Sequence, residues 1–169
     1  MSDDATLRAL RASPLFREFN DAQLLAMADA LDCRRYAEGH VFSKTGHRTR
    51  RPQDALFIIL DGEVAVSTAV QTAHQVPVER RLKPGEMFGL ITFLKGGSRT
   101  ANTQAASPVH IASLTHDHYE QLIRADPALN SAFLLAVASQ LARDVRACNQ
   151  RLAAAINKDS VVQKIPARP

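Results

Sequence analysis

All seven glycines of this 169-residue chain lie between residues 39 and 97, where they separate short runs of β-prone residues. Glycine adopts left-handed turn conformations readily, so this spacing indicates many tight turns between short strands. Short strands joined by such turns form antiparallel sandwiches or barrels. We expect strands at residues 33–36, 40–43, 55–60, 63–69, 76–82, 99–106 and 109–114.

The pair Asp61-Gly62 stands between two of these apolar runs, and this dipeptide is typical of a two-residue hairpin turn. The sequence therefore predicts that the strands on either side of it pair with each other. Alternation along the two strands also predicts which side chains face the core. These are Phe57, Ile59, Val64 and Val66.

Helical patterns flank the glycine-rich part of the chain. Residues 5–12 and 21–31 are expected to be helices, the second one capped by Asn20 or Asp21 and carrying the apolar residues Leu24, Leu25, Met27, Ala28 and Leu31. Thr115 is expected to cap a third helix, which ends at Asp126-Pro127. Proline is favoured at the first position of a helix, so the last helix should run from residue 127 to about residue 156.

The resulting fold class is mainly β, an antiparallel β-roll or jelly-roll barrel with an N-terminal helix, a short helix after Gly89 and two C-terminal helices. We expect four divisions: an N-terminal helical segment at residues 1–32, the β-roll at 33–115, the C-terminal helices at 116–156 and a flexible tail at 157–169. The tail contains proline and several charges, which is typical of a frayed terminus.

The last helix carries apolar or small residues at alternating three- and four-residue spacing, namely Leu134, Ala138, Leu141, Val145, Cys148, Leu152 and Ala155. Such a seam suits pairing with the same helix of a second copy. Packing against the chain's own barrel is the alternative, and it is favoured near the start of the helix, around Phe133. Beyond Val145 the helix is expected to extend past the barrel, so the sequence predicts a homodimer.

Charge and cysteine content narrow the class of protein. The net charge of +4 permits an anionic partner, although a solvated face is the alternative reading of the basic runs at residues 48–51 and 80–83. Cys33 and Cys148 form neither a zinc pattern nor a disulfide framework, which fits a reducing compartment. The N-terminus does not resemble a signal peptide and no apolar run is long enough to span a bilayer. We therefore expect a cytoplasmic protein.

No catalytic motif is apparent. The six histidines form no HExxH pattern, and the sequence contains no serine elbow, catalytic cysteine–histidine pattern or Walker loop. We expect neither an enzyme nor a metal protein. The residues after 156 are too few for a helix-turn-helix, so direct DNA binding is not expected either.

Residues 85–102, GEMFGLITFLKGGSRTAN, combine the features of an anion pocket. Glycine lets the backbone approach a ligand closely, and a short helical turn after it directs N–H groups toward negative charge. Arg99, nine residues after Leu90, could make a two-pronged phosphate contact from a strand. The alternative is a glycine-rich hairpin with a solvated arginine.

Several fragments, in order and at matching spacing, resemble the cyclic nucleotide-binding domain family, which includes catabolite-activator-type regulators and kinase regulatory subunits. The resemblance extends from about residue 15 to residue 152 and implies a β-roll sensor without catalytic activity. Its specific points are Glu38-Gly39 with Phe42, Gly46, LFIILDGEV at 56–64, KPGEMFG at 83–89, SRTA at 98–101 and YEQLIRADPALN at 119–130.

The resemblance also implies roles for single residues. Arg99 would pair with the exocyclic oxygens of a cyclic phosphate, with Thr100 and the Ala101 backbone beside it. Gly89 and Thr92 would line the side of the short helical turn. The base would lie between the roll and the last helix, where Asn149 is a candidate contact and a surface asparagine is the alternative.

One departure from the family affects the sugar. The family has a glutamate directly after the second glycine of the cassette, and that glutamate accepts a hydrogen bond from the ribose 2'-hydroxyl. This chain has Leu90 there. A charged hydrogen bond contributes about 1.5–3 kcal/mol, so its loss predicts binding at least about 10–100-fold weaker than in a pocket with the glutamate. A second departure is a longer, basic loop at residues 46–54, which could reach a second phosphate or an acidic partner, or could be merely solvated.

Two functions remain open. The first is a ligand sensor that binds cAMP, cGMP, cyclic di-GMP or another anion and signals through its last two helices to an effector protein. The second is a dimerisation or protein-interaction module with a degenerate pocket that binds no nucleotide. The presence of Arg99, Thr100 and Ala101 favours the first.

Overall fold

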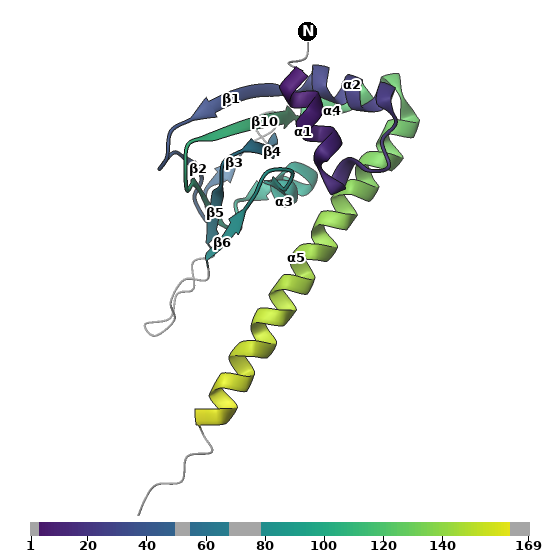
Figure 1. Ribbon diagram of the computed structural model, residues 1–169. Coiled ribbons are helices and arrows are strands. Elements are labelled where there is room, and N and C mark those ends of the chain that lie inside the picture. Colours follow the sequence, from purple (N-terminus) through teal and green to yellow (C-terminus); the bar gives the residue numbers. More distant parts are fainter. Residues whose placement is uncertain (1–3, 50–54, 68–78, 163–169) are drawn as a thin grey trace, which may run out of the picture.

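The structure, a computed structural model, describes residues 4–49, 55–67 and 79–162. Its strands form a roll, the N-terminal helices and α4 (His116–Ala125) gather at one end of the roll, and the long C-terminal helix α5 (Pro127–Val162) descends past it (Figure 1). Every strand pair is antiparallel. The predicted fold class, an antiparallel β-roll with flanking helices, is therefore confirmed.

The strands divide into two four-stranded sheets and one short ribbon. The first sheet has the order β1 (Asp32–Tyr36), β10 (Val109–Thr115), β4 (Ala55–Asp61) and β7 (Met87–Phe88). The second has the order β2 (Val41–Ser43), β9 (Asn102–Ala105), β5 (Val64–Ser67) and β6 (Glu79–Leu82). The ribbon pairs β3 (Arg48–Thr49) with β8 (Gly97–Ser98). Parts of three predicted segments, at 50–54, 68–69 and 76–78, lie outside the described residues.

The prediction of a hairpin at Asp61-Gly62 is wrong. The strand before the turn, β4, pairs with β10 and β7, whereas the strand after it, β5, pairs with β6 and β9. The chain therefore passes from one sheet to the other at Gly62. A Cβ at this position would lie 2.3 Å from the carbonyl oxygen of Pro108, and the φ angle is +82°, so the turn needs glycine for close backbone approach rather than for a hairpin.

The helices match most of the predicted boundaries. They are α1 (Asp4–Ala12), the 3-10 turn η1 (Pro14–Phe16), α2 (Asp21–Ala30), α3 (Leu90–Lys95), α4 (His116–Ala125) and α5 (Pro127–Val162). Asn20 caps α2 in a reciprocal capping box with Gln23, and the Thr115 side chain accepts from the His118 N–H at the start of α4. Leu25 of the predicted apolar face is nearly half exposed, because it lies on the outer side of α2.

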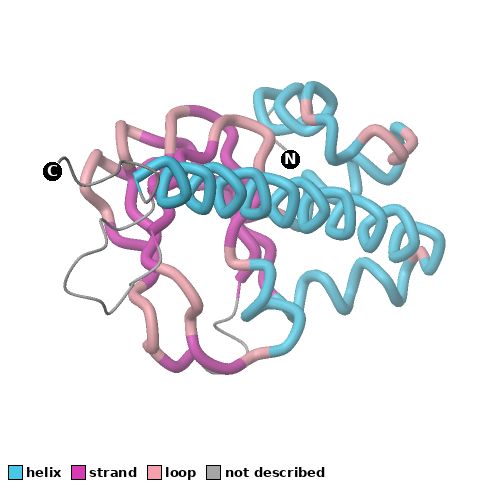
Figure 2. Tube along the Cα trace, turned by 90° about the horizontal axis from the view of Figure 1, so that it is seen from below, coloured by secondary structure: helices cyan, strands magenta, loops and turns pink. Residues whose placement is uncertain are grey.

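The last helix continues to Val162, where the sequence predicted a tail from residue 157. Seen from below, α5 runs from the helical end of the molecule across its strand end (Figure 2). The helix contains neither glycine nor an internal proline up to Val162, so no residue in it forces an earlier end. Within the described residues, no helix is both long enough and apolar enough to cross a membrane.

Two hydrophobic clusters fill the molecule. The larger one lies between the first sheet and the helices and contains Leu10, Phe16, Met27, Ile58, Leu114, Leu129 and Phe133. The smaller one lies inside the roll and contains Ile59, Val64, Leu82, Phe88 and Ile111, with Phe57 and Val66 packed half-buried against it. The predicted core side of the two strands is therefore correct. Leu90 and Phe93 of α3 belong to the larger cluster, which anchors this short helix to the helical end of the molecule.

Candidate ligand pocket

A pocket of about 160 Å³ opens between the roll, α3 and α5. Six residues that the sequence analysis selected line it together: Gly89, Leu90, Thr92, Arg99, Thr100 and Ala101. Four of its other lining residues are Phe57, Val66, Arg80 and Asp144. The seventh selected residue, Asn149, is exposed on α5 and does not line the pocket. The residues of α5 that do line it are Leu141 and Asp144, earlier on the helix.

Gly89 allows the backbone to enter the pocket wall. Its φ angle is +83°, a conformation that residues with a side chain rarely adopt. A Cβ there would lie 2.8 Å from the carbonyl oxygen of Ala55 and 3.5 Å from a terminal guanidinium nitrogen of Arg99. Glycine therefore keeps open the space beside the Arg99 guanidinium.

The first turn of α3 forms part of the wall. Its first helical hydrogen bond joins the Phe93 N–H to the Gly89 carbonyl at 3.0 Å, so the N–H groups of Leu90, Ile91 and Thr92 have no acceptor inside the helix. Leu90, Ile91 and Thr92 all line the pocket. Backbone donors at the start of a helix attract negative charge.

Arg99 reaches the pocket from a break between β8 and β9, not from within a strand as predicted. Its N–H donates to the His47 carbonyl at 3.0 Å and its carbonyl accepts from the Gly46 N–H at 2.9 Å, which fixes the backbone against the β3 side of the roll. Two residues on, the Ala101 carbonyl accepts from the Ser43 hydroxyl at 3.0 Å. The Arg99 residue is only 8% exposed, which is unusual for an arginine and places a positive charge inside the pocket.

The wall next to Gly89 is apolar. Leu90 is 5% exposed and packs in the larger core cluster. Because its side chain is a hydrocarbon, it offers a ligand no hydrogen-bond acceptor. Ile91, Phe57 and Val66 extend this apolar lining. The pocket thus combines a cationic end at Arg99 with an apolar wall around Leu90.

A second arginine lines the pocket and was not singled out from the sequence. Arg80 on β6 donates to Glu86 at 2.6 Å and also forms an ion pair with Asp144 of α5. Burial lowers the pKa of Arg80, but hydrogen bonding and charge attraction from Asp144 and then Glu86 outweigh it and raise the pKa above its ordinary value. The alternation of β6 was the available signal, because it places Arg80 on the same face as the buried Leu82 and Arg81 on the other.

Aromatic contacts join the pocket to the C-terminal helices. Phe93 of α3 lies with its ring centroid 5.6 Å from His116, 5.5 Å from Tyr119 and 6.2 Å from Phe133. Tyr119 also contacts Phe133 at 4.8 Å, and its hydroxyl donates to Asn130 at 2.7 Å. Burial raises the pKa of Tyr119, so this hydroxyl stays protonated at neutral pH. A displacement of α3 would therefore change the packing of Phe93 against α4 and α5.

The described residues contain no group of three or more histidine, cysteine or acidic side chains placed to hold a metal ion. The cationic side chains that line the pocket belong to Arg80 and Arg99.

Residues 33–126, more than half of the chain, match the family described as "Cyclic nucleotide-binding domain". Among curated proteins, the chain is 31% identical over 122 residues to the cyclic nucleotide-gated potassium channel mll3241 of Mesorhizobium japonicum, a match that covers 72% of this chain and 31% of the channel. It is 29% identical over 110 residues to the cGMP-dependent protein kinase egl-4 of Caenorhabditis elegans, covering 64% of this chain and 14% of the kinase. The chain thus spans about a third or less of these relatives.

Solved structures have the same fold. A cyclic nucleotide-binding domain from Methylobacillus flagellatus superposes with a TM-score of 0.75 at 22% identity, covering 89% of this chain and 82% of the other. The catabolite activator protein of Thermus thermophilus superposes with a TM-score of 0.66 at 26% identity, covering 84% of this chain and 62% of the other.

The burial of Leu90 generates a prediction about stability. Leu90→Glu would place a carboxylate in the larger core cluster, and we expect it to lower the free energy of unfolding by at least about 3 kcal/mol. Leu90→Met keeps the volume and apolar character and should cost less than about 1.5 kcal/mol. Urea unfolding of both variants and the parent chain measures the difference. A Leu90→Glu variant as stable as Leu90→Met would mean that this side chain faces the ligand space and not the core.

Proposed function

The chain belongs to the cyclic nucleotide-binding domain family, and from that premise we propose that it is a non-enzymatic ligand sensor. Its ligand is a cyclic nucleotide or a related phosphate-containing compound, which binds with its phosphate at Arg99. The observation that carries this proposal is the buried Arg99 guanidinium in a pocket that also includes the first turn of α3. A forked guanidinium together with backbone N–H donors is suited to a phosphodiester.

The candidate ligands are cAMP, cGMP and cyclic di-GMP. Similarity to a cyclic nucleotide-gated channel and to a cGMP-dependent kinase supports a cyclic nucleotide such as cAMP or cGMP. The apolar Leu90 leaves a ribose hydroxyl without an acceptor at that point, which disfavours ligands that depend on such a contact. A ligand that gains its affinity mainly from phosphate contacts fits the lining better.

We expect ligand binding to change the positions of α4 and α5, and we expect an effector protein to recognise that change. Phe93 packs on Tyr119 and Phe133, so a shift of α3 on binding would change the packing of both helices. The ligand would move an existing equilibrium between two helix positions only as far as its affinities for the two positions differ.

Calorimetry with cAMP, cGMP and cyclic di-GMP tests the proposal. We expect heat of binding with at least one of them, and Arg99→Gln should weaken that binding by at least about tenfold because a charged, forked hydrogen bond is lost. The matched control is Arg124→Gln, since Arg124 is exposed on α4 and pairs only with Glu120 among the ion pairs described for it. The control should leave the affinity unchanged.

Absence of heat with all three ligands, in protein shown to be folded, would contradict the proposal. The alternative function would then stand, a dimerisation or protein-interaction module whose pocket binds no nucleotide. Binding that Arg99→Gln leaves unchanged would place the ligand elsewhere on the molecule.

We further propose that the sensor is a homodimer paired through α5. Val145, Leu152 and Ile156 are each more than half exposed in the chain, and they share one face of the helix with the exposed Cys148. This face continues the seam that begins at Leu134, which is also exposed. Pairing with a second copy would remove these apolar side chains from water, at about 25 cal/mol per Å² of apolar surface.

Cysteine crosslinking provides the test of this pairing. If two α5 helices pair in parallel and in register, their Cys148 side chains meet, and mild oxidation should give a covalent dimer that Cys148→Ser abolishes. Leu152→Asp should convert the protein to a monomer in light scattering, because it buries a charge in the seam. Gln150→Asp, an equally acidic change off the seam, should not. A wild-type chain that is monomeric at micromolar concentration would contradict the pairing.

A further inference from the structure

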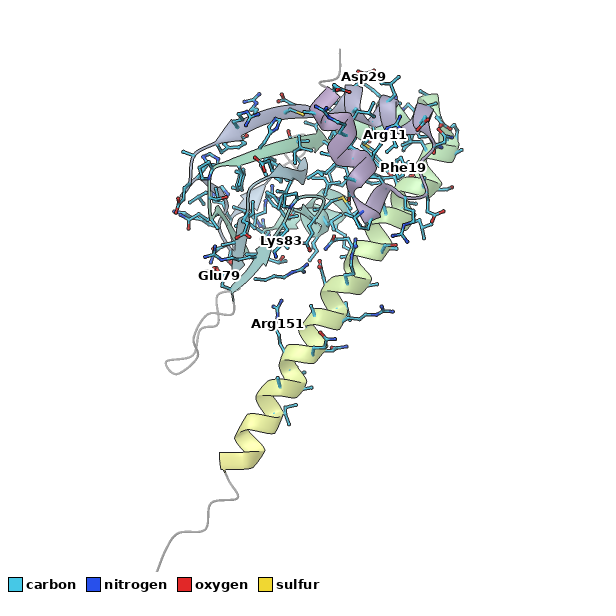
Figure 3. The ribbon with its side chains drawn as sticks, viewed as in Figure 1. Arg11, Phe19, Asp29, Glu79, Lys83 and Arg151 are labelled. Carbon is cyan, nitrogen blue, oxygen red and sulfur yellow. The ribbon has the colours of Figure 1, made fainter. Side chains whose placement is uncertain are left out.

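One part of the pocket wall is an ion-pair cluster that joins the roll to α5. Arg80 of β6 pairs through one terminal nitrogen with Glu86 at 2.6 Å and through the other with Asp144 of α5. Asp144 also accepts a hydrogen bond from the buried Gln140 one helical turn earlier, at 2.8 Å. Arg80 and Asp144 both line the pocket. In Figure 3, Glu79 and Lys83 mark the β6 edge of the roll, on the side past which α5 runs.

The two partners of Arg80 differ in what holds them. Glu86 belongs to the turn after β6, and its second oxygen accepts from the Lys83 N–H at 2.9 Å, so it is fixed within the roll. Asp144 belongs to α5, which packs mainly on α4 and η1 rather than on the strands. The Arg80–Asp144 pair is therefore a bond between two bodies, and it breaks if α5 moves away from the roll.

The charges of the cluster are unequal. Arg80 contributes one positive charge and its two carboxylate partners contribute two negative charges, so one carboxylate can leave without making the guanidinium an unpaired charge. The raised pKa of Arg80, which lies well above neutral pH, keeps the guanidinium charged throughout the neutral range. An anionic group that enters the pocket can thus take the place of Asp144 on Arg80. Asp144 would keep Gln140 as a partner when it is released.

We propose that Arg80 exchanges Asp144 for a second anionic group of the ligand, and that this exchange frees α5 from the roll. The proposal rests on the proposed function, because it assumes that Arg99 holds the first phosphate. It names the ligand class more narrowly: a compound with two phosphate groups, such as a cyclic dinucleotide, in which two riboses link the phosphates.

Calorimetry with one ligand of each kind tests the ligand class. For cyclic di-GMP, Arg80→Gln should weaken binding by at least about tenfold, and Asp144→Asn should strengthen it severalfold because it removes a competitor for Arg80. Arg80→Lys, which keeps the charge without the fork, should lose less than Arg80→Gln. For cAMP, with one phosphate, these variants should change affinity less than about threefold.

The matched control is Arg81→Gln. Arg81 is the next residue on β6, is more than half exposed and pairs with Glu63 and Glu79 on the outer face. This variant should leave the affinity for both ligands unchanged. A general effect of losing one positive charge would appear in it as strongly as in Arg80→Gln.

Hydrogen exchange of the α5 amides tests the release of the helix. Cyclic di-GMP should raise the exchange of the amides around Asp144, and Asp144→Asn should raise it without any ligand. Exchange that stays unchanged or falls in these two cases would overturn the proposal. So would cyclic di-GMP binding that does not depend on Arg80. If cAMP binds in an Arg99-dependent manner and cyclic di-GMP does not bind, this inference fails while the proposed function stands; if no nucleotide binds, both fail.

Discussion

The packing of Phe93 against Tyr119 and Phe133 connects the ligand pocket to the rest of the molecule. Phe93 is 1% exposed and Phe133 is fully buried, and both belong to the cluster that also holds Leu90. Aromatic pairs of this kind contribute about 0.5–1.5 kcal/mol each beyond the burial of their area. The short helix α3 is therefore packed into the core and does not lie loosely on the surface of the roll. It shares one core with α4 and the start of α5, and any change in its position has a cost in that core.

The order of the elements could be predicted because it depends on local signals. Asn20, Thr115 and Pro127 each mark a helix start through their own side chains, and the structure has helices beginning there. The grouping of Arg99 with Gly89 also depends on a short stretch of chain. The pairing of β4 and β5 could not be predicted, because the dipeptide Asp61-Gly62 has the same sequence signature in a hairpin as in a passage between two sheets. The Arg80–Asp144 pair was missed for a similar reason, since it joins residues 64 positions apart and each is ordinary in its own segment. Asn149 was selected without knowledge of the rotation of α5, and the helix turns Leu141 and Asp144 to the pocket instead.

The two arginines of the pocket differ in what their positions allow. Arg99 has its backbone bonded to residues 46 and 47 within the roll, so it can hold a ligand without moving. Arg80 shares its charge between the roll and α5, so under the proposal a ligand that reaches it would change how the helix is held. Together with the apolar Leu90, this arrangement favours affinity from phosphate groups over affinity from a sugar. Under the proposed function, a bound ligand would have two routes to the helices, one through the core at Phe93 and one through the ion pair at Asp144.

A crystal structure of the chain grown with cyclic di-GMP, and separately with cAMP, would show directly whether a phosphate group binds at Arg99. We expect phosphate oxygens within about 3.2 Å of the Arg99 guanidinium and near the N–H groups at the start of α3, in at least one of the two crystals. A ligand bound elsewhere with the Arg99 pocket vacant, or a pocket that stays vacant at saturating concentrations of both, would contradict this expectation.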